Sequence, residues 1–100
     1  MKYGIAVSYS YEGDEAAWAN VVDEFTQAVS ADTALSGRLS YHVQRSNDGR
    51  RLHIGRWDSE ETVKLLQSRD YFTSFAAALQ RLAGDSLSSQ RFEVTHAALP

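Results

Sequence analysis

The sequence contains no cysteine and a single proline, which is residue 100. The lack of cysteine excludes a disulfide framework, a thiolate zinc site and a cysteine nucleophile. The sequence also lacks a large excess of either charge, because 10 Lys and Arg residues are nearly balanced by 13 Asp and Glu residues, for a net charge of −3. A chain with this balance has no basic surface for nucleic acid or for an anionic membrane. We therefore expect neither partner.

Long hydrophobic runs are missing as well. No apolar run approaches the ~20 residues of a membrane span, and the first residues, MKYGI, lack the apolar core of a secretory signal. We therefore expect a cytoplasmic protein. The composition, 43% hydrophobic and 23% charged, is typical of a folded chain. Its length fits one domain over residues 1–100.

The hydrophobic pattern changes its period along the chain. Apolar and polar side chains alternate over residues 3–11, 38–45 and 51–57, which predicts strands with one buried face each. Apolar residues recur at steps of three and four over residues 15–30, which predicts an amphipathic helix. The Asp-Gly pair in the segment 46–49 predicts a β-hairpin between the second and third strands.

A second helical segment extends from Asp58 to Gly84. Asp58, followed three residues later by Glu61, fits a capping box, and Gly84 suits the C-terminal end. The polar residues 67–70 interrupt the apolar stripe, so we expect a kink or break there. Residues 91–96 then form the last strand, with Phe92 and Val94 on its buried face.

The resulting order, β-α-β-β-α-β, predicts an α+β, ferredoxin-like fold. Right-handed crossovers place both helices on one face of a four-stranded antiparallel sheet. We expect the parity with larger apolar side chains to face the helices: Ile5, Val7, Leu39, Tyr41, Val43, Leu52, Ile54, Phe92 and Val94. The other parity, with Ala6, Ser8, Ser40, His42, Gln44, His53, Gly55, Trp57, Glu93 and Thr95, then faces away from them.

That open face is mixed in character rather than charged. A sheet face that stays in contact with water usually carries more Lys, Glu and Thr. We therefore predict a homodimer in which the open faces of two subunits pack together, with Trp57 as an anchor. The residues predicted at the interface are His42, Gln44, His53, Trp57 and Thr95. Hydrogen bonding across the interface is a better interpretation of His42 and His53 than a metal site, so we expect no metal.

Two segments carry a resemblance to a known family. The stretch from Ile54 to Glu61, IGRWDSEE, and the stretch from Ser68 to Phe75, SRDYFTSF, resemble the antibiotic biosynthesis monooxygenases. This family consists of dimeric α/β barrels. The resemblance implies oxidation of an aromatic, polyketide-like or quinol-type substrate by O₂ without a metal or flavin cofactor. The stretch from Leu65 to Ala78 lacks the His and Trp of haem-degrading relatives, which argues against that activity.

Several aromatic and polar residues are candidates for a site between the helices and the sheet. Tyr71, at the start of the second half of the helical segment, and Arg56, with Tyr9 in support, are the predicted catalytic residues. If these residues have only a structural role, the aromatic ones pack in the core and Arg56 lies at the rim of the sheet. The residues predicted to bind the aromatic ligand are Trp18, Tyr41, Phe72, Phe75 and His96.

Other functions remain open at this point. A non-catalytic dimeric barrel that binds a small apolar ligand or serves in a stress response is the main alternative. A lyase or isomerase on the same scaffold is a third. Phosphate-binding loops, dinucleotide fingerprints and nucleophile elbows are all missing from the sequence.

Overall fold

The computed structural model describes residues 1–98. Within this range the elements follow one another as β1 (Tyr3–Ser10), α1 (Glu15–Ala31), β2 (Leu39–Arg45), β3 (Arg50–Trp57), α2 (Glu60–Gln67), α3 (Asp70–Ala83) and β4 (Ser88–Glu93). Short 3-10 turns, Thr33–Leu35 and Gly84–Ser86, precede β2 and β4. This order confirms the predicted β-α-β-β-α-β pattern, with the second helical segment divided in two.

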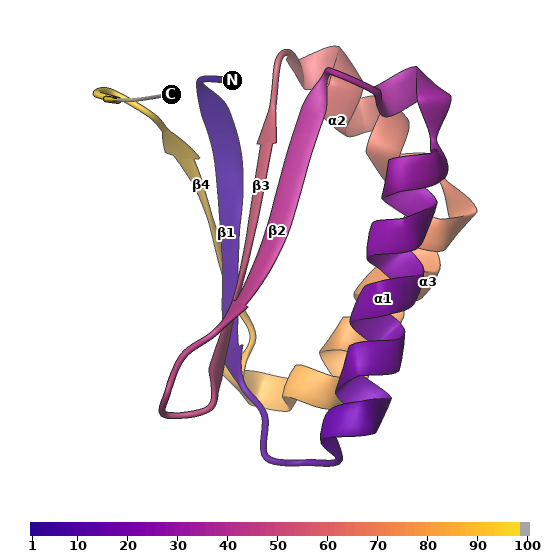
Figure 1. The fold of residues 1–100 in the computed structure, drawn as a ribbon, viewed down its shortest axis with the longest axis vertical. Coiled ribbons are helices and arrows are strands. Elements are labelled where there is room, and N and C mark those ends of the chain that lie inside the picture. The colour runs from indigo at the N-terminus through magenta and orange to yellow at the C-terminus, as the bar shows by residue number, and fades with distance from the viewer. Residues whose placement is uncertain (99–100) are drawn as a thin grey trace.

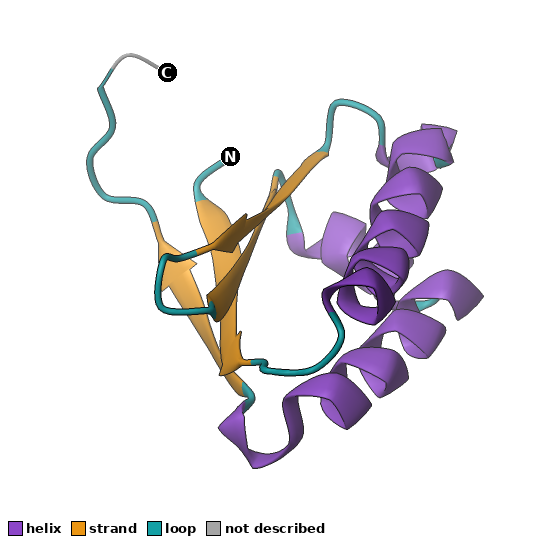
Figure 2. Cartoon of the chain, turned by 60° about the horizontal axis from the view of Figure 1, so that its bottom comes forward, coloured by secondary structure: helices purple, strands orange, loops and turns teal. Residues whose placement is uncertain are grey.

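The strands form one antiparallel sheet in the order β2-β3-β1-β4. The helices lie in a layer against one face of the sheet, and the other face carries no helix in the described chain (Figures 1 and 2). The ferredoxin-like α+β fold is therefore confirmed. Every helix of residues 1–98 is too short or too polar to cross a membrane.

Both helical segments begin and end close to the positions that their sequences predict. The Asp14 carboxylate accepts a hydrogen bond from the Ala16 backbone N–H at 3.0 Å, which satisfies a free donor at the start of α1. Gly84, with φ of 57°, follows the end of α3 in the left-handed region that favours glycine. The polar residues 67–70 separate α2 from α3, as predicted.

The capping box predicted at Asp58 is wrong. Helix α2 has Ser59 as its N-cap residue, and this side chain makes no capping hydrogen bond. Asp58 lies one residue further out, where its carboxylate accepts a hydrogen bond from the Thr62 hydroxyl. The helix begins one residue later than predicted, so the carboxylate contacts a side chain instead of a backbone N–H.

The register of the sheet corrects the predicted faces of the third strand. Val7 lies opposite His53, and Tyr9 lies opposite Arg51. Residues directly opposite each other in an antiparallel pair share a face, and Tyr9 belongs to the core beneath the helices. The buried residues of β3 on this helix side are therefore Arg51, His53, Gly55 and Trp57, whereas Leu52, Ile54 and Arg56 lie on the open face.

The prediction failed on β3 because alternation separates two faces without identifying the buried one. The large aliphatic residues Leu52 and Ile54 suggested the core, whereas His53 suggested the surface. His53 is nevertheless only 1% exposed, and Trp57 is 5% exposed. Both are thus placed in the protein core and not, as predicted, on the open face.

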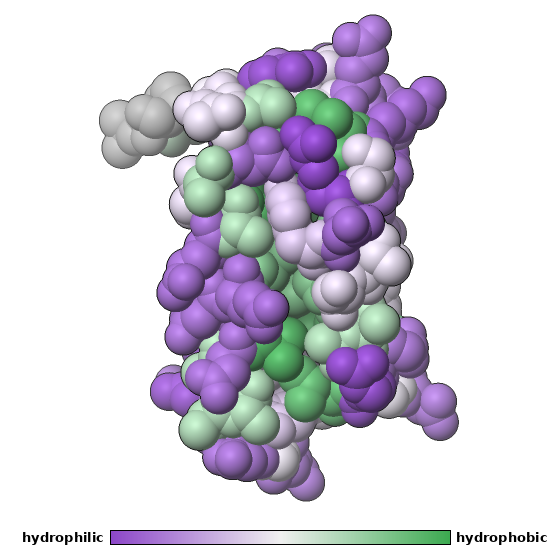
Figure 3. Space-filling view, turned by 90° about the vertical axis from the view of Figure 1, so that its right-hand side faces the viewer, coloured by the Kyte–Doolittle hydropathy of each residue, from purple (hydrophilic) through white to green (hydrophobic). Residues whose placement is uncertain are grey.

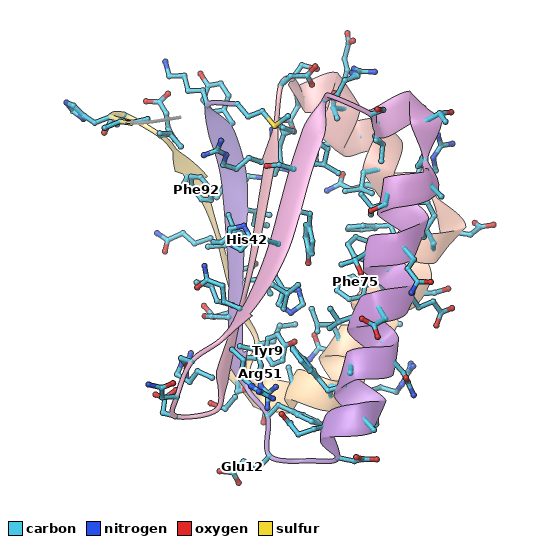
Figure 4. All side chains as sticks on the ribbon, viewed as in Figure 1. Tyr9, Glu12, His42, Arg51, Phe75 and Phe92 are labelled. Carbon is cyan, nitrogen blue, oxygen red and sulfur yellow. The ribbon has the colours of Figure 1, made fainter. Side chains whose placement is uncertain are left out.

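Strand β4 also differs from its prediction. It spans Ser88–Glu93 rather than residues 91–96, and Phe92 lies opposite Gly4 on the open face. A Cβ atom at Gly4 would overlap the Phe92 ring, so the glycine leaves room for this ring. The prediction of Phe92 on the buried face is therefore wrong. Figure 4 shows Phe92 on the side of the sheet away from the helices, and Phe75 in the space between α3 and the sheet.

The main core is formed by aromatic and aliphatic residues between the sheet and the helices. Phe25 of α1 stacks on Phe75 of α3 with ring centroids 3.9 Å apart, and both rings are buried. Leu66 and Leu79 extend this cluster. On the outer surface of the helix layer, polar side chains alternate with patches of apolar atoms (Figure 3). The helices are thus amphipathic, as their sequence period predicts.

Candidate functional site

A chain of hydrogen bonds between aromatic side chains extends along the helix side of the sheet. Trp18 Nε1 donates to Tyr9 Oη at 2.7 Å. Tyr9 Oη is 2.7 Å from His53 Nε2, and His53 Nδ1 is 2.6 Å from Tyr41 Oη. Helix α1 and three neighbouring strands therefore each contribute one member. We call the four residues Trp18, Tyr9, His53 and Tyr41 the aromatic relay.

The direction of these hydrogen bonds follows from the surroundings of Tyr9. This side chain is 0% exposed, and its oxygen already accepts the indole N–H of Trp18. Among residues 1–98 the only remaining partner of its hydroxyl is His53 Nε2, so satisfying the Tyr9 proton requires donation to that nitrogen. A neutral imidazole then carries its proton on Nδ1 and donates it to Tyr41. We assign this tautomer from the network, and it leaves the Tyr41 hydroxyl proton available to another acceptor.

Burial keeps the relay uncharged. Removal from water lowers the pKa of His53 from 6.5 to about 4, so the imidazole is neutral at pH 7. Burial likewise raises the pKa of Tyr9, although the hydrogen bond from Trp18 and the positive charge of Arg51 oppose this shift. Burial is also the main reason that the pKa of Tyr41 is raised. Both phenols are therefore protonated at pH 7.

Arg51 lies beside the Tyr9 end of the relay (Figure 4). Its guanidinium carbon lies 4.4 Å from the Trp18 ring centroid, and its Nη2 is 2.7 Å from Glu15 Oε2. The side chain is only 2% exposed, and its Nη1 has no hydrogen-bond partner among residues 1–98. A buried cation thus directly neighbours the Trp18–Tyr9 pair.

The Tyr41 side chain also lines an apolar cavity of about 240 Å³ between the sheet and the helices. A cavity of roughly 150 Å³ accommodates benzene, so this one has room for a larger flat aromatic molecule. Its polar lining residues are Tyr41, Gln67, Ser89 and Arg91. The apolar walls include Ile5, Val7, Phe25, Leu39, Trp57, Val63, Leu66, Phe72, Phe75 and Leu79.

Arg91 closes one side of this cavity while remaining half exposed. Its guanidinium carbon lies 5.3 Å from the Trp57 ring centroid, and its Nη1 is 3.0 Å from Glu60 Oε1. The Arg91 and Glu60 side chains are 52% and 56% exposed, so water reaches this ion pair. Residues 1–98 contain no group of three or more His, Asp or Glu side chains placed to hold a metal ion.

Comparisons with known proteins find this architecture in solved structures. No family model matches the sequence, and no curated protein matches it. A Caulobacter crescentus structure, provisionally named an antibiotic biosynthesis monooxygenase, has a TM-score of 0.78 and 18% identity, over 94% of this chain and 90% of that one. A variant of SnoaB, a cofactor-independent oxygenase from Streptomyces nogalater, has a TM-score of 0.71 and 14% identity, over 99% of this chain and 98% of the other.

The chain has the antibiotic biosynthesis monooxygenase fold. Rv0793 from Mycobacterium tuberculosis shares it too, with a TM-score of 0.79 and 14% identity, over 98% of this chain and 99% of that protein. The resemblance drawn from the sequence is thereby confirmed for the fold. At these identities the likeness concerns the fold alone, and the site must be argued from this chain's own residues.

Within the antibiotic biosynthesis monooxygenase fold, some of the predicted site residues lie together and others lie away from the cavity. Tyr9, Trp18 and Tyr41 come together in the aromatic relay, and Tyr41, Phe72 and Phe75 line the cavity. Their functional roles remain predictions. Arg56 was expected to face the helices, but it lies opposite Gly4 and Ser40 on the open face. His96 lies beyond the end of β4, is exposed, and does not line the cavity.

Tyr71 contacts the end of helix α1. Its hydroxyl donates to Asp32 Oδ2 at 2.7 Å, and Arg69 Nε is 2.9 Å from the same oxygen. The hydrogen bond from Tyr71 is the main reason that the pKa of Asp32 is lowered. Burial, reinforced by the carboxylate, raises the pKa of Tyr71 to about 12. These contacts join α1 to the break between α2 and α3, and Tyr71 does not line the apolar cavity.

The Tyr71→Phe variant distinguishes a structural role from the predicted catalytic one. Removing a hydrogen bond to a charged acceptor should lower the free energy of unfolding by about 1–2 kcal/mol, measured by urea denaturation. We expect kcat for an oxidised substrate to stay within about twofold, since the hydroxyl is bonded outside the cavity. A large loss of kcat in a fully folded variant would support the catalytic role.

Sequence reasoning missed His53, Arg51 and Arg91 as members of the site. His53 was assigned to the open face, whereas it links Tyr9 and Tyr41 at sequence separations of 44 and 12 residues. The available signal was that His53 shares one face of the strand with Arg51, Gly55 and Trp57, which are every second residue of β3. Pairing that parity with Tyr9 instead of with Ala6 would have placed Arg51 and His53 correctly.

Proposed function

We propose that this protein is a cofactor-independent monooxygenase that oxidises a small aromatic or quinol-type molecule with O₂. The observation that carries the proposal is an apolar cavity lined by Tyr41, whose hydroxyl accepts a hydrogen bond from His53 and has its own proton free to donate. Apolar walls with few polar groups suit a flat aromatic ligand. The likeness of fold to SnoaB, a cofactor-independent oxygenase, supports this choice.

The chemistry needs an electron-rich substrate anion and O₂ alone. An anthrone-type substrate loses a proton to water, and a hydrogen bond from Tyr41 stabilises the charge on its oxygen. The anion transfers an electron to O₂, and the two radicals combine to form a carbon-bound peroxide anion. After protonation, the peroxide loses water and leaves a carbonyl group. One oxygen atom of O₂ enters the product and the other leaves as water.

The Tyr41→Phe variant tests this proposal with anthrone as the substrate and oxygen uptake as the measurement. Removing one donor to a developing oxyanion typically lowers kcat by about 10²–10³-fold, and we expect a loss of this size. Tyr3→Phe is the matched control, since Tyr3 is 46% exposed and belongs to neither the relay nor the cavity. No oxygen uptake by the wild-type protein over a panel of anthrones and quinols would contradict the proposal.

Binding without catalysis is the second candidate. No carboxylate lines the apolar cavity within the described residues, so the site offers a ligand no anionic general base. A non-catalytic barrel would bind 1-naphthol or anthrone in the cavity and consume no oxygen. Calorimetric titration combined with an oxygen electrode therefore separates the two functions.

We further propose that the protein is a homodimer that packs its open sheet faces together. The corrected register supports this arrangement with a partly different set of residues, in which His42 and Gln44 remain from the prediction. Ala6, Leu52, Ile54 and Phe92 lie on the helix-free face beside the polar residues His42 and Gln44. These apolar side chains are half-buried in the single chain and no helix of residues 1–98 covers this face, so a partner subunit can bury their remaining surface. His53 and Trp57 drop out of the proposed interface, since both are buried beneath the helices.

A further inference from the structure

We propose that the aromatic relay delivers a proton from the Tyr9 hydroxyl, through His53 and Tyr41, to an oxyanion in the apolar cavity. This inference rests on the proposed function, because it supplies the proton that the peroxide anion takes up. It assigns His53 a role as a proton carrier and Tyr9 a role as the proton source. It also makes the buried cation Arg51 part of the site.

The geometry provides a continuous path for the proton. The separations of 2.7 Å from Tyr9 to His53 Nε2 and 2.6 Å from Nδ1 to Tyr41 are short hydrogen bonds. Tyr9 and His53 each accept one hydrogen bond and donate another, and such chains strengthen their neighbouring hydrogen bonds. The path ends at Tyr41, the one member of the relay that also lines the apolar cavity.

The transfer is balanced and leaves His53 neutral. The Tyr41 O–H bond breaks as its proton moves to the peroxide oxygen, and the Nδ1 proton moves to Tyr41. The Tyr9 proton then moves to Nε2, so the imidazole changes tautomer without gaining charge. The products are a hydroperoxide and a Tyr9 phenolate. The hydroperoxide then loses hydroxide and a proton from its carbon, which leaves the carbonyl group. That proton returns along the same path and restores Tyr9. The hydroxide combines with the proton that the substrate first lost to water.

Two neighbours of Tyr9 stabilise the phenolate that this transfer forms and offset part of the cost of its burial. The Trp18 indole donates a hydrogen bond to the Tyr9 oxygen. Arg51 lies directly across from Tyr9 in the sheet and stacks on the same indole. Glu15 balances part of this positive charge from the solvent side, where its side chain is 49% exposed. A peroxide anion is also more basic than an ordinary phenolate, which favours transfer of the proton to the peroxide.

The Tyr9→Phe variant removes the proton source but retains the ring and the cavity lining. Proton transfer by a positioned group typically contributes about 10²–10⁴-fold. We expect kcat for anthrone oxidation to fall by at least ~10²-fold with KM nearly unchanged, and the solvent deuterium isotope effect on kcat to rise, because protonation of the peroxide then limits the rate. Tyr11→Phe is the matched control, because that hydroxyl donates to the Asp14 carbonyl outside the relay.

A second measurement needs no substrate. In ¹⁵N NMR spectra at pH 7, His53 should carry its proton on Nδ1, and Tyr9→Phe should shift the population toward the Nε2-protonated tautomer. An Nε2-protonated His53 in the wild-type protein would overturn the relay.

A Tyr9→Phe variant with wild-type kcat and isotope effect would overturn the relay too and leave the oxygenase proposal intact. If the wild-type protein consumes no oxygen with any substrate, the oxygenase proposal fails, and with it the delivery of a proton to a peroxide.

Discussion

Acidification from pH 7 to pH 4 should lower the free energy of unfolding by about 3 kcal/mol through His53 alone. The pKa of this group falls from 6.5 in an exposed setting to about 4 in the folded protein, because burial disfavours the imidazolium. The unfolded chain therefore takes up a proton below pH 6.5 that the folded protein rejects until about pH 4. The stability is present above pH 6.5 and is lost as the pH falls through this window.

Urea denaturation of the wild-type protein and of His53→Gln, at fixed protein concentration, measures this effect. The glutamine amide can donate and accept hydrogen bonds but does not titrate, so the slope between pH 6.5 and pH 4 should largely disappear. Asp32 and Asp58 have lowered pKa values through the Tyr71 and Thr62 hydrogen bonds respectively, so their contribution is lost only at more acidic pH. Equal slopes for wild type and variant in the upper window would refute the assignment.

The Ile54→Asp variant should convert the proposed homodimer into monomers. Ile54 lies opposite both Ala6 and His42, in the middle of the open face. Burying an unpaired carboxylate between two sheets costs about 3–5 kcal/mol, which corresponds to a dissociation constant raised roughly 10²–10⁴-fold. Light scattering at micromolar concentration should change from twice the chain mass to the monomer mass of 11.1 kDa.

Two further variants make the dimer experiment specific. Asn20→Asp places the same charge on the exposed surface of α1 and should leave the mass unchanged. His42→Asp puts a carboxylate on the open face at a residue that is exposed in the single chain, so it should separate the subunits without disturbing the core. Circular dichroism verifies that each variant is folded. A wild-type protein with a mass of 11.1 kDa would contradict the dimer.

Local features of the fold were predictable because their causes are local. The hairpin needed only Asp48-Gly49, and the start of α1 needed only Asp14. The break after α2 followed from the polar residues 67–70. In each case the decisive hydrogen bonds or backbone angles involve residues close in sequence, so the signal lies within a short window.

The site was less predictable because it depends on pairings between distant segments. Tyr9, Trp18 and Tyr41 could be selected as aromatic residues with polar atoms, yet nothing local shows that His53 connects two of them. That contact follows from the register of β1 and β2 on β3. The sequence does not distinguish a buried histidine from an exposed one. Burial of His53 becomes favourable only because the two phenols satisfy its ring nitrogens.

The ion pair between Arg91 and Glu60 and the neutral aromatic relay should respond differently to dissolved salt. Counterions at physiological ionic strength screen charges over about 8 Å, and both members of the ion pair are half exposed. The relay residues carry no charge at pH 7, and Tyr9 and His53 are 0% and 1% exposed. Ionic strength therefore acts directly on the Arg91 side of the cavity, and it reaches the relay only through the Glu15 partner of Arg51. Salt in the medium should thus affect the entry of a ligand more than the movement of protons along the relay.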